Sequence, residues 1–170
     1  MHCKLVKLHQ YSGEKASVYS LNIEKYQKTL FDIFLEENTS SFKSEIKEIM
    51  RYITLISTKT GARTSYFKEQ EGGRGSENLF ALFDETDRNL RLYCLNYGTE
   101  IIILGGGGYK DSSISALQDD PKLKKENYIL RSLCREMDKR IREGNIEYTA
   151  DYLDFVADSE DDFEFEIEIE

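Results

Sequence analysis

Residues 78–107 read NLFALFDETDRNLRLYCLNYGTEIIILGGG, and this stretch decides how the chain folds. It contains three apolar runs, at 78–84, 89–97 and 100–105, which are separated by only four and two residues. Runs of this length are typical of strands, and connections this short join antiparallel neighbours. The stretch therefore predicts a three-stranded β-meander.

The third run predicts the centre of the sheet. Ile101–Leu104 are all apolar, so both faces of this strand need cover. The Gly105–Gly108 run that follows lacks the P-loop pattern, and a meander does not offer the parallel βαβ setting of a dinucleotide fingerprint. We interpret the glycines as a point of close backbone approach and of a sharp exit from the central strand, which carries Tyr109 and Lys110 to the end of the sheet near Arg91.

The N-terminal half predicts a hairpin followed by two helices. Apolar and polar residues alternate over 3–9 and 16–23, with a turn sequence between them. From 24 to 37 the apolar spacing becomes helical. A second helix is predicted from about 42 to 57, with Ser41 as its N-cap.

The C-terminal half predicts a third helix and a final strand. Asp120 is a suitable N-cap with Pro121 at the first helical position, and Gly144 is a suitable stop. Residues 58–77 are rich in glycine and predict a loop. Residues 163–170 alternate between apolar and acidic side chains, which predicts a strand with one carboxylate face.

Composition favours one folded domain with an acidic tail. Of the 170 residues, 39% are hydrophobic, which is enough for a packed interior. Residues 151–170 hold ten Asp and Glu and no Lys or Arg, so removing them from the net charge of −9 leaves the rest of the chain at +1. We predict a single α+β domain at 1–150 and an acidic tail at 151–170. A near-neutral body remains compatible with an anionic ligand.

The cysteines and histidines argue against disulfide and metal chemistry. Cys3, Cys94 and Cys134 are odd in number, widely spaced and form no C-x-x-C pair. The two histidines, His2 and His9, lack the spacing of a metal centre or of a catalytic triad. No apolar run has the length of a membrane span and no export signal is present, so we expect a cytoplasmic protein without a membrane partner.

The strand at 89–97 carries the candidate binding residue. Alternation puts Leu90 and Leu92 on one face, which suits helix cover, and Arg91 and Tyr93 on the opposite, more open face. An arginine on a rigid strand can hold a phosphate with its planar fork while a nearby ring stacks on a base. The alternative is an ordinary surface arginine that is solvated or paired with the tail.

The acidic tail has two interpretations. Its carboxylate face can lie along the Arg91 side of the sheet, in the place of the RNA backbone or of an antitoxin's acidic strand, while Phe163, Phe165 and Ile167 pack on the body. The alternative is an edge strand whose charges prevent aggregation.

Together these segments resemble a known family. The residues NLFALF at 78–83, NLRLY at 89–93 and IIIL at 101–104, with a glycine-rich turn closing on Lys110, follow the layout of RelE/ParE-superfamily toxins, particularly the HigB-like branch. The resemblance implies an α+β fold in which a small antiparallel meander packs against two or three helices. An N-terminal hairpin and an acidic C-terminal strand would be additions to it.

Over residues 65–140, the resemblance implies the toxin of a toxin–antitoxin system. Such a toxin cleaves mRNA, free or on the ribosome, without metal or cofactor, and a helix-turn-helix antitoxin neutralises it. Cleavage needs a cation on the transition state, a base near the 2′-hydroxyl and an acid near the leaving oxygen. The candidates for these three roles are Arg91 for the cation, Lys68 or Glu69 for the base, and Lys110 or Tyr109 for the acid. The candidates for RNA contact are Arg63, Arg74 and Tyr93.

Other functions stay open at this point. A non-catalytic member of the same fold would act as a binding or regulatory protein, and a member of the ParE-like branch would inhibit a topoisomerase. A small-molecule enzyme has little support, because the sequence offers no clear nucleophile–base pair and no metal cluster.

Overall fold

Strand β7 (Ile101–Tyr109) is the central strand of a mixed sheet in the computed structural model, which describes residues 1–68, 77–82, 87–111 and 120–168. The strand order is β10-β1-β2-β7-β6-β5-β4, and β3 pairs with the end of β2. β2 and β7 run parallel, and the other neighbouring pairs are antiparallel. The other strands of this sheet are β1 (His2–Lys7), β2 (Ser17–Ile23), β3 (Lys28–Thr29), β4 (Phe67–Lys68), β5 (Leu79–Leu82), β6 (Leu90–Tyr97) and β10 (Glu164–Glu166).

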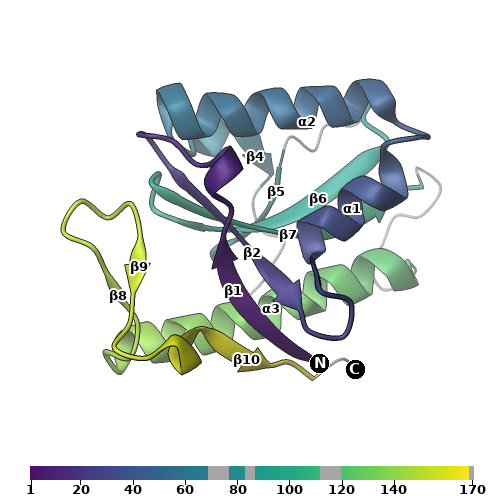
Figure 1. Cartoon of the computed structure of the whole chain (residues 1–170). Coiled ribbons are helices and arrows are strands. Elements are labelled where there is room, and N and C mark those ends of the chain that lie inside the picture. Colours follow the sequence, from purple (N-terminus) through teal and green to yellow (C-terminus); the bar gives the residue numbers. More distant parts are fainter. Residues whose placement is uncertain (69–76, 83–86, 112–119, 169–170) are drawn as a thin grey trace.

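Helices cover both faces of this sheet, which gives an α+β fold in three layers (Figure 1). Ile102 and Leu104 belong to the core on the side of α1 and α2, and Ile101 and Ile103 belong to the core on the side of α3. All four side chains are fully buried, so the prediction of a central strand with cover on both faces is confirmed. The helices are α1 (Leu30–Asn38), α2 (Lys43–Leu55) and α3 (Pro121–Arg142).

The predicted N-terminal hairpin is confirmed, and it forms one sheet with the meander. β1 and β2 pair antiparallel from Cys3↔Ile23 to Lys7↔Tyr19. β2 also pairs with β7, which joins the hairpin to the three antiparallel strands β5, β6 and β7. Parallel strands need a long crossover connection, and α1 and α2 lie within it.

α1 begins later than the predicted helix at 24–37. Residues 24–27 form a turn instead, in which Gln27 has a φ of 53°, and the turn leads into β3. Thr29 then caps the helix, and Asp32 completes a capping box with it. The helix therefore starts at Leu30, where these cap bonds fix its first turn.

The other two helices lie close to their predicted positions. α2 has Phe42 rather than Ser41 at its N-cap. For α3, Asp120 accepts a hydrogen bond from the Leu123 N–H at 3.1 Å, and Gly144 ends the helix with a φ of 80°. Among the described residues, none of the helices combines the length and the apolar surface needed to cross a bilayer.

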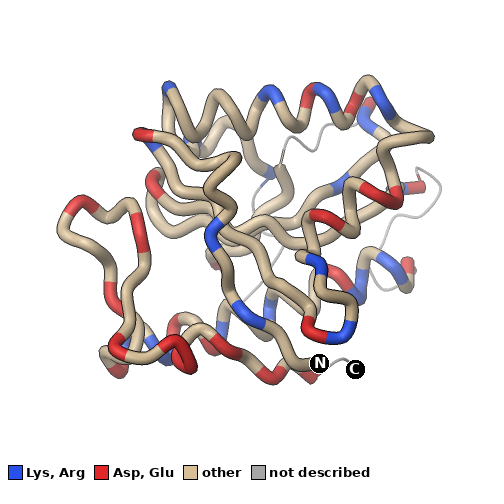
Figure 2. Tube along the Cα trace, viewed as in Figure 1, with Lys and Arg blue, Asp and Glu red and all other residues tan. Residues whose placement is uncertain are grey.

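The acidic C-terminal residues are part of the fold. After α3, β8 (Glu147–Tyr148) and β9 (Phe155–Val156) form a hairpin beside the main sheet, and β10 pairs with β1 at the sheet edge (Figure 1). Phe165 and Ile167 are each 1% exposed and join the core on the α3 side. Asp and Glu residues follow one another along the hairpin and along the chain around β10 (Figure 2).

The described part of the tail does not cover Arg91. β1, β2 and β7 separate β10 from β6, the strand that carries Arg91. The interpretation of the tail as a mask over Arg91 is therefore wrong for these residues. The physical reason is the burial of Phe165, which holds the apolar face of β10 in the core and leaves the carboxylates of this strand toward solvent.

Candidate functional site

A gap between β2 and β7 is the starting point of the candidate site. Pairing between the two strands runs from Ser17↔Ile101 to Ser20↔Leu104 and ends there. Ser20 Oγ donates to Leu104 O at 2.7 Å and accepts from the Phe31 N–H at 3.3 Å. This buried hydroxyl ties the last strand pair to the first turn of α1, and α1 takes the place of a strand beside the rest of β7.

The glycine run of β7 lets α3 approach the sheet closely. The run begins at a β-bulge against β6. A Cβ at Gly105 would lie 2.5 Å from Leu130 Cδ1, and a Cβ at Gly106 would overlap Glu126 Oε2. Side chains at these two positions would push α3 away, so the interpretation of the run as a close backbone approach is confirmed. The predicted sharp exit from the strand is wrong, because β7 continues through the glycines to Tyr109.

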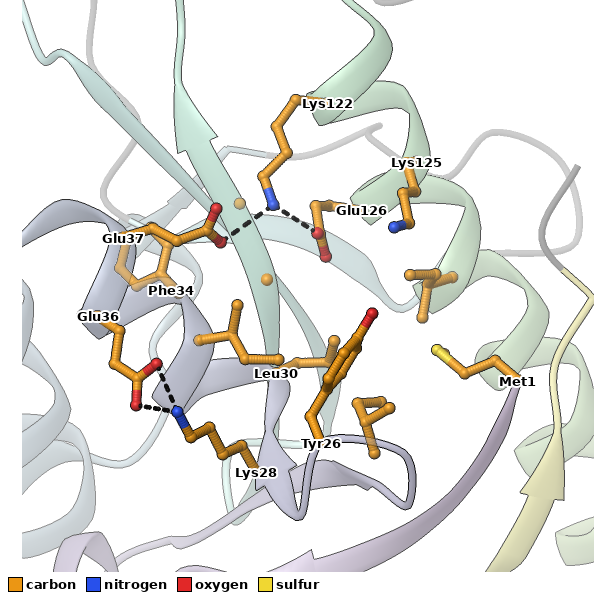
Figure 3. A pocket seen from close by; sticks show the side chains of 15 residues that line it. Met1, Tyr26, Lys28, Leu30, Phe34, Glu36, Glu37, Lys122, Lys125 and Glu126 are labelled. Carbon is orange, nitrogen blue, oxygen red and sulfur yellow. Dashed lines mark hydrogen bonds and ion pairs between the residues drawn. The ribbon is translucent and has the colours of Figure 1, made fainter.

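A pocket of about 350 Å³ lies between α1 and α3 over this glycine run (Figure 3). One face of α3 lines it, with Lys122, Lys125, Glu126 and Ile129 at positions i, i+3, i+4 and i+7. Tyr26, from the turn before β3, also lines the pocket and is 53% exposed. The apolar wall consists of Met1, Ile23, Leu30, Ile33, Phe34 and Ile129.

Glu126 is the buried carboxylate of this pocket. The residue is 5% exposed, and its Oε1 accepts a hydrogen bond from Lys122 Nζ at 3.0 Å. Its Oε2 has no hydrogen-bond partner in the described part of the chain and lies over Gly106, which also lines the pocket. Nearly all buried polar atoms of native proteins are paired, so an unpaired buried oxygen in a pocket is a candidate point of ligand contact.

Lys122 joins carboxylates of two helices. Its Nζ lies 3.2 Å from Glu37 Oε1 on α1 and 3.0 Å from Glu126 Oε1 on α3. Burial lowers the pKa of Lys122, but the charges and hydrogen bonds of Glu126 and Glu37 outweigh this effect, so the pKa is raised above its ordinary value. Lys122 is therefore protonated at neutral pH, and one cation stands between two carboxylates.

Lys125 is the second cation on this face of α3. It lines the pocket beside Glu126 (Figure 3), and it forms no hydrogen bond or ion pair with another residue that the structure describes. Lys28, by contrast, is paired with Glu36 at 2.9 Å. The pocket thus places the ammonium group of Lys125 beside the Glu126 carboxylate, of which only Oε1 has a hydrogen-bond partner among the described residues.

The structure also brings Arg91 and Lys110 to one face of the sheet. Arg91 is in register with Gly108, and the Lys110 N–H donates to Asn89 O at 2.8 Å. Arg91 of β6 and Lys110, which directly follows β7, are therefore diagonal neighbours, and such neighbours lie about 7–8 Å apart in regular strand geometry. A Cβ at Gly108 would contact Lys122, which shows that this is the face covered by α3. The prediction that Arg91 lies on the more open face of the sheet is therefore wrong, because α3 covers that face. Both residues are half-buried.

Tyr93 and Tyr109 do not join them. Tyr93 is 0% exposed in the core beneath α3, because a helix covers the face that alternation alone presents as open. The prediction of an exposed ring at Tyr93, available to stack on RNA, is wrong for this reason. Tyr109 lies on the opposite face of the sheet from Arg91, where its ring stacks on Phe42 with the ring centroids 5.8 Å apart.

The remaining predicted residues are spread over the molecule. Lys68 is exposed in the edge strand β4, and β5 separates it from β6. Arg63 is exposed and follows Ala62, whose N–H donates to Thr99 O in the β6–β7 turn. This turn lies at the opposite end of β6 from Arg91. Glu69 and Arg74 lie outside the described residues.

Sequence reasoning missed Glu126 and its neighbours in the pocket. The buried stripe of α3 includes Leu123 and Leu130, and Glu126 stands three residues after the first and four before the second. An apolar residue is expected at that position of a helical stripe. Carboxylates are almost never fully buried without a partner, so the charge in this stripe was the available signal.

No family model, curated protein or solved structure matches the chain. The resemblance to RelE/ParE toxins therefore depends on the sequence pattern alone, and the candidate site depends on its own geometry.

Proposed function

We propose that this protein binds a small amphipathic molecule in the pocket between α1 and α3, with a hydrogen-bond donor of the ligand placed at Glu126 Oε2. The proposal depends on one observation, the buried carboxylate oxygen without a partner among the described residues. An unsatisfied buried acceptor costs about 1–3 kcal/mol, and more when it is charged. A ligand that donates to Oε2 recovers this free energy, which favours binding at this place.

The rest of the pocket suits such a ligand. Its volume of about 350 Å³ is at the lower end of the range of about 300–1,000 Å³ for small-molecule sites. Leu30 and Ile33 of α1 and Ile129 of α3 provide apolar surface for the body of the ligand. A mainly apolar wall with a few convergent polar groups is the usual composition of a binding site.

The lining favours binding over covalent catalysis. No serine, threonine, cysteine or histidine is among the described residues that line the pocket. Lys122 is protonated between two carboxylates, and an ammonium group is not a nucleophile. These properties support the alternative of a non-catalytic binding or regulatory protein.

Substitution of Glu126 tests the proposal. The probe is 3-methylbutylamine, which combines an amine donor with a short apolar chain, and its affinity is measured by calorimetric titration. We expect the wild-type protein to bind it and Glu126→Gln to lose about tenfold or more in affinity, because the ionised acceptor is lost. Glu136→Gln, on the same helix but outside the pocket, should bind like wild type. Failure of the wild-type protein to bind both this amine and L-leucine, the zwitterion with the same side chain, or equal affinity of wild type and Glu126→Gln, would overturn the proposal.

A second candidate is the metal-independent mRNA endoribonuclease that the RelE/ParE resemblance implies, on a RelE-like fold. The observation that favours it is the shared sheet face of Arg91 and Lys110, since a fixed guanidinium and a nearby ammonium suit a phosphate in transfer. Its partners would be mRNA or the ribosome, and a helix-turn-helix antitoxin. Expression should then arrest bacterial growth, Arg91→Ala should relieve the arrest, and programmed ribosomes should show cleaved mRNA. Arrest without cleavage would favour a ParE-like topoisomerase inhibitor instead.

A further inference from the structure

We infer that the ligand of this pocket is zwitterionic, in the manner of a free α-amino acid with an apolar side chain. Its ammonium group would bind Glu126 Oε2, its carboxylate would bind Lys125, and its side chain would lie on the apolar wall. This inference rests on the proposed function and adds the chemical class of the ligand to it.

The charges of the pocket carry the first step. Lys122 neutralises only one of the two carboxylates that it bridges, Glu37 and Glu126, so this group of three has one negative charge in excess. Lys28 and Glu36 cancel each other. A neutral donor would satisfy Oε2 but would leave the excess charge in a partly buried place. An ammonium group of the ligand would both donate a hydrogen bond to Oε2 and neutralise the excess negative charge. A charge-assisted hydrogen bond is also about twice as strong as a neutral one.

Lys125 carries the second step. It has no hydrogen-bond or ion-pair partner within the described residues and lines the same pocket. The excess positive charge therefore stands next to the excess negative charge, on consecutive residues of α3. An α-amino acid has its ammonium and carboxylate groups bonded to the same carbon atom, so adjacent opposite charges in the pocket match it. A simple amine or a simple fatty acid would match only one of the two.

The apolar wall and the pocket size carry the third step. Ile129 follows Glu126 by three residues on the same face of α3, so apolar surface begins one helical turn from the charged pair. Ile23, Leu30 and Ile33 continue this surface from β2 and α1. A pocket of about 350 Å³ suits one short apolar side chain better than a long acyl chain.

Three related compounds test the inference. L-leucine carries both charges, 3-methylbutylamine lacks the carboxylate, and 4-methylpentanoate lacks the ammonium group. Calorimetric titration of the full chain should give leucine the highest affinity, with each of the other two weaker by about tenfold or more. Lys125→Met should reduce the affinity for leucine to that for the amine and leave the affinity for the amine unchanged. Lys124→Met, one residue away and outside the pocket lining, is the matched control and should bind leucine like wild type.

The outcomes separate the inference from the proposed function. Binding of the amine as tight as that of leucine, or an unchanged affinity for leucine in Lys125→Met, would overturn the zwitterion and leave the proposed function in place. Failure of both the amine and leucine to bind the wild-type protein would overturn both. Circular dichroism and the melting temperature of each variant show whether a lost affinity has a folding cause.

Discussion

At the scale of single residues, the contact between Glu126 and Gly106 fixes the geometry of the pocket. The carboxylate lies directly over the glycine of a neighbouring strand, and a methyl group at that position would overlap Oε2. Oε2 therefore occupies the space that a side chain at position 106 would fill. The other oxygen of Glu126, Oε1, accepts a hydrogen bond from Lys122.

Gly106→Ala should therefore damage the pocket directly. The added methyl group must displace the Glu126 carboxylate or shift α3, and overpacking of this kind costs about 1–3 kcal/mol. We expect a lower free energy of unfolding in urea and loss of amine binding in calorimetric titration. Gly108→Ala is the matched control, since its Cβ would meet Lys122 Cγ at an ordinary 3.5 Å. Equal free energies of unfolding and equal amine affinities in the two variants would contradict the close contact between Gly106 and Glu126.

At the scale of elements, the attachment of β10 is concentrated at Phe165 and Arg140. Phe165 is 1% exposed, and the Arg140 guanidinium lies 4.1 Å from the centre of its ring. Arg140 Nη1 also donates to Asp162 O at 2.7 Å and to Glu164 O at 2.6 Å. The last helix thus holds the last strand by an aromatic contact and by two backbone acceptors.

Phe165→Ala should accordingly cost far more than its place near the chain terminus suggests. Removing a fully buried phenylalanine side chain costs about 3–5 kcal/mol, through the lost burial and the cavity that remains. Urea denaturation followed by circular dichroism measures this loss. Val156→Ala, at a residue that is 44% exposed, should change the free energy of unfolding by less than about 0.5 kcal/mol. A similar small change in Phe165→Ala would mean that β10 contributes little to stability.

The elements also show what the sequence predicted and what it did not. The central strand at 101–104 and α3 were predicted correctly, because apolar runs and cap residues are local signals. The parallel pairing of β2 with β7 leaves no local signal, since Ser17 meets Ile101 only in the folded chain. The same limit explains Tyr93, because alternation shows which residues share a face but does not show which helix covers it. The start of α1 was missed, because the turn at 24–27 places a non-glycine residue at positive φ.

At the scale of the whole molecule, three free cysteines are buried in the two cores. Burial raises the pKa of Cys3 and of Cys134 from 9.0 to about 12, and it raises the pKa of Cys94 as well. Burial also raises the pKa of Tyr97. In each case the folded state favours the neutral form, whereas the unfolded chain releases the proton at the ordinary pKa.

The protein should therefore lose stability in alkali. A raised pKa contributes stability that is complete below the unfolded pKa, near 9.0 for the thiols, and that is lost as the pH rises toward about 12. We expect the urea midpoint to be constant between about pH 7 and 8 and to fall steadily above about pH 9. Cys94→Ala keeps the site small and apolar but removes one titrating thiol, so its decline should be shallower. A midpoint that does not change up to about pH 11 would contradict the buried placement of these groups.

The pairing of β1 with β10 has a consequence for the order of events during synthesis. Cys3 leaves the ribosome long before its partner Phe165 is made, and contacts so distant in sequence form slowly. Until then the outer backbone groups of β1 are open to any other extended chain. The carboxylates around β10, which repel neighbouring copies, arrive together with the strand that closes this edge (Figure 2). The nascent chain is consequently most exposed to aggregation shortly before residues 164–166 are translated, and chaperone contact with β1 is of most use in that interval.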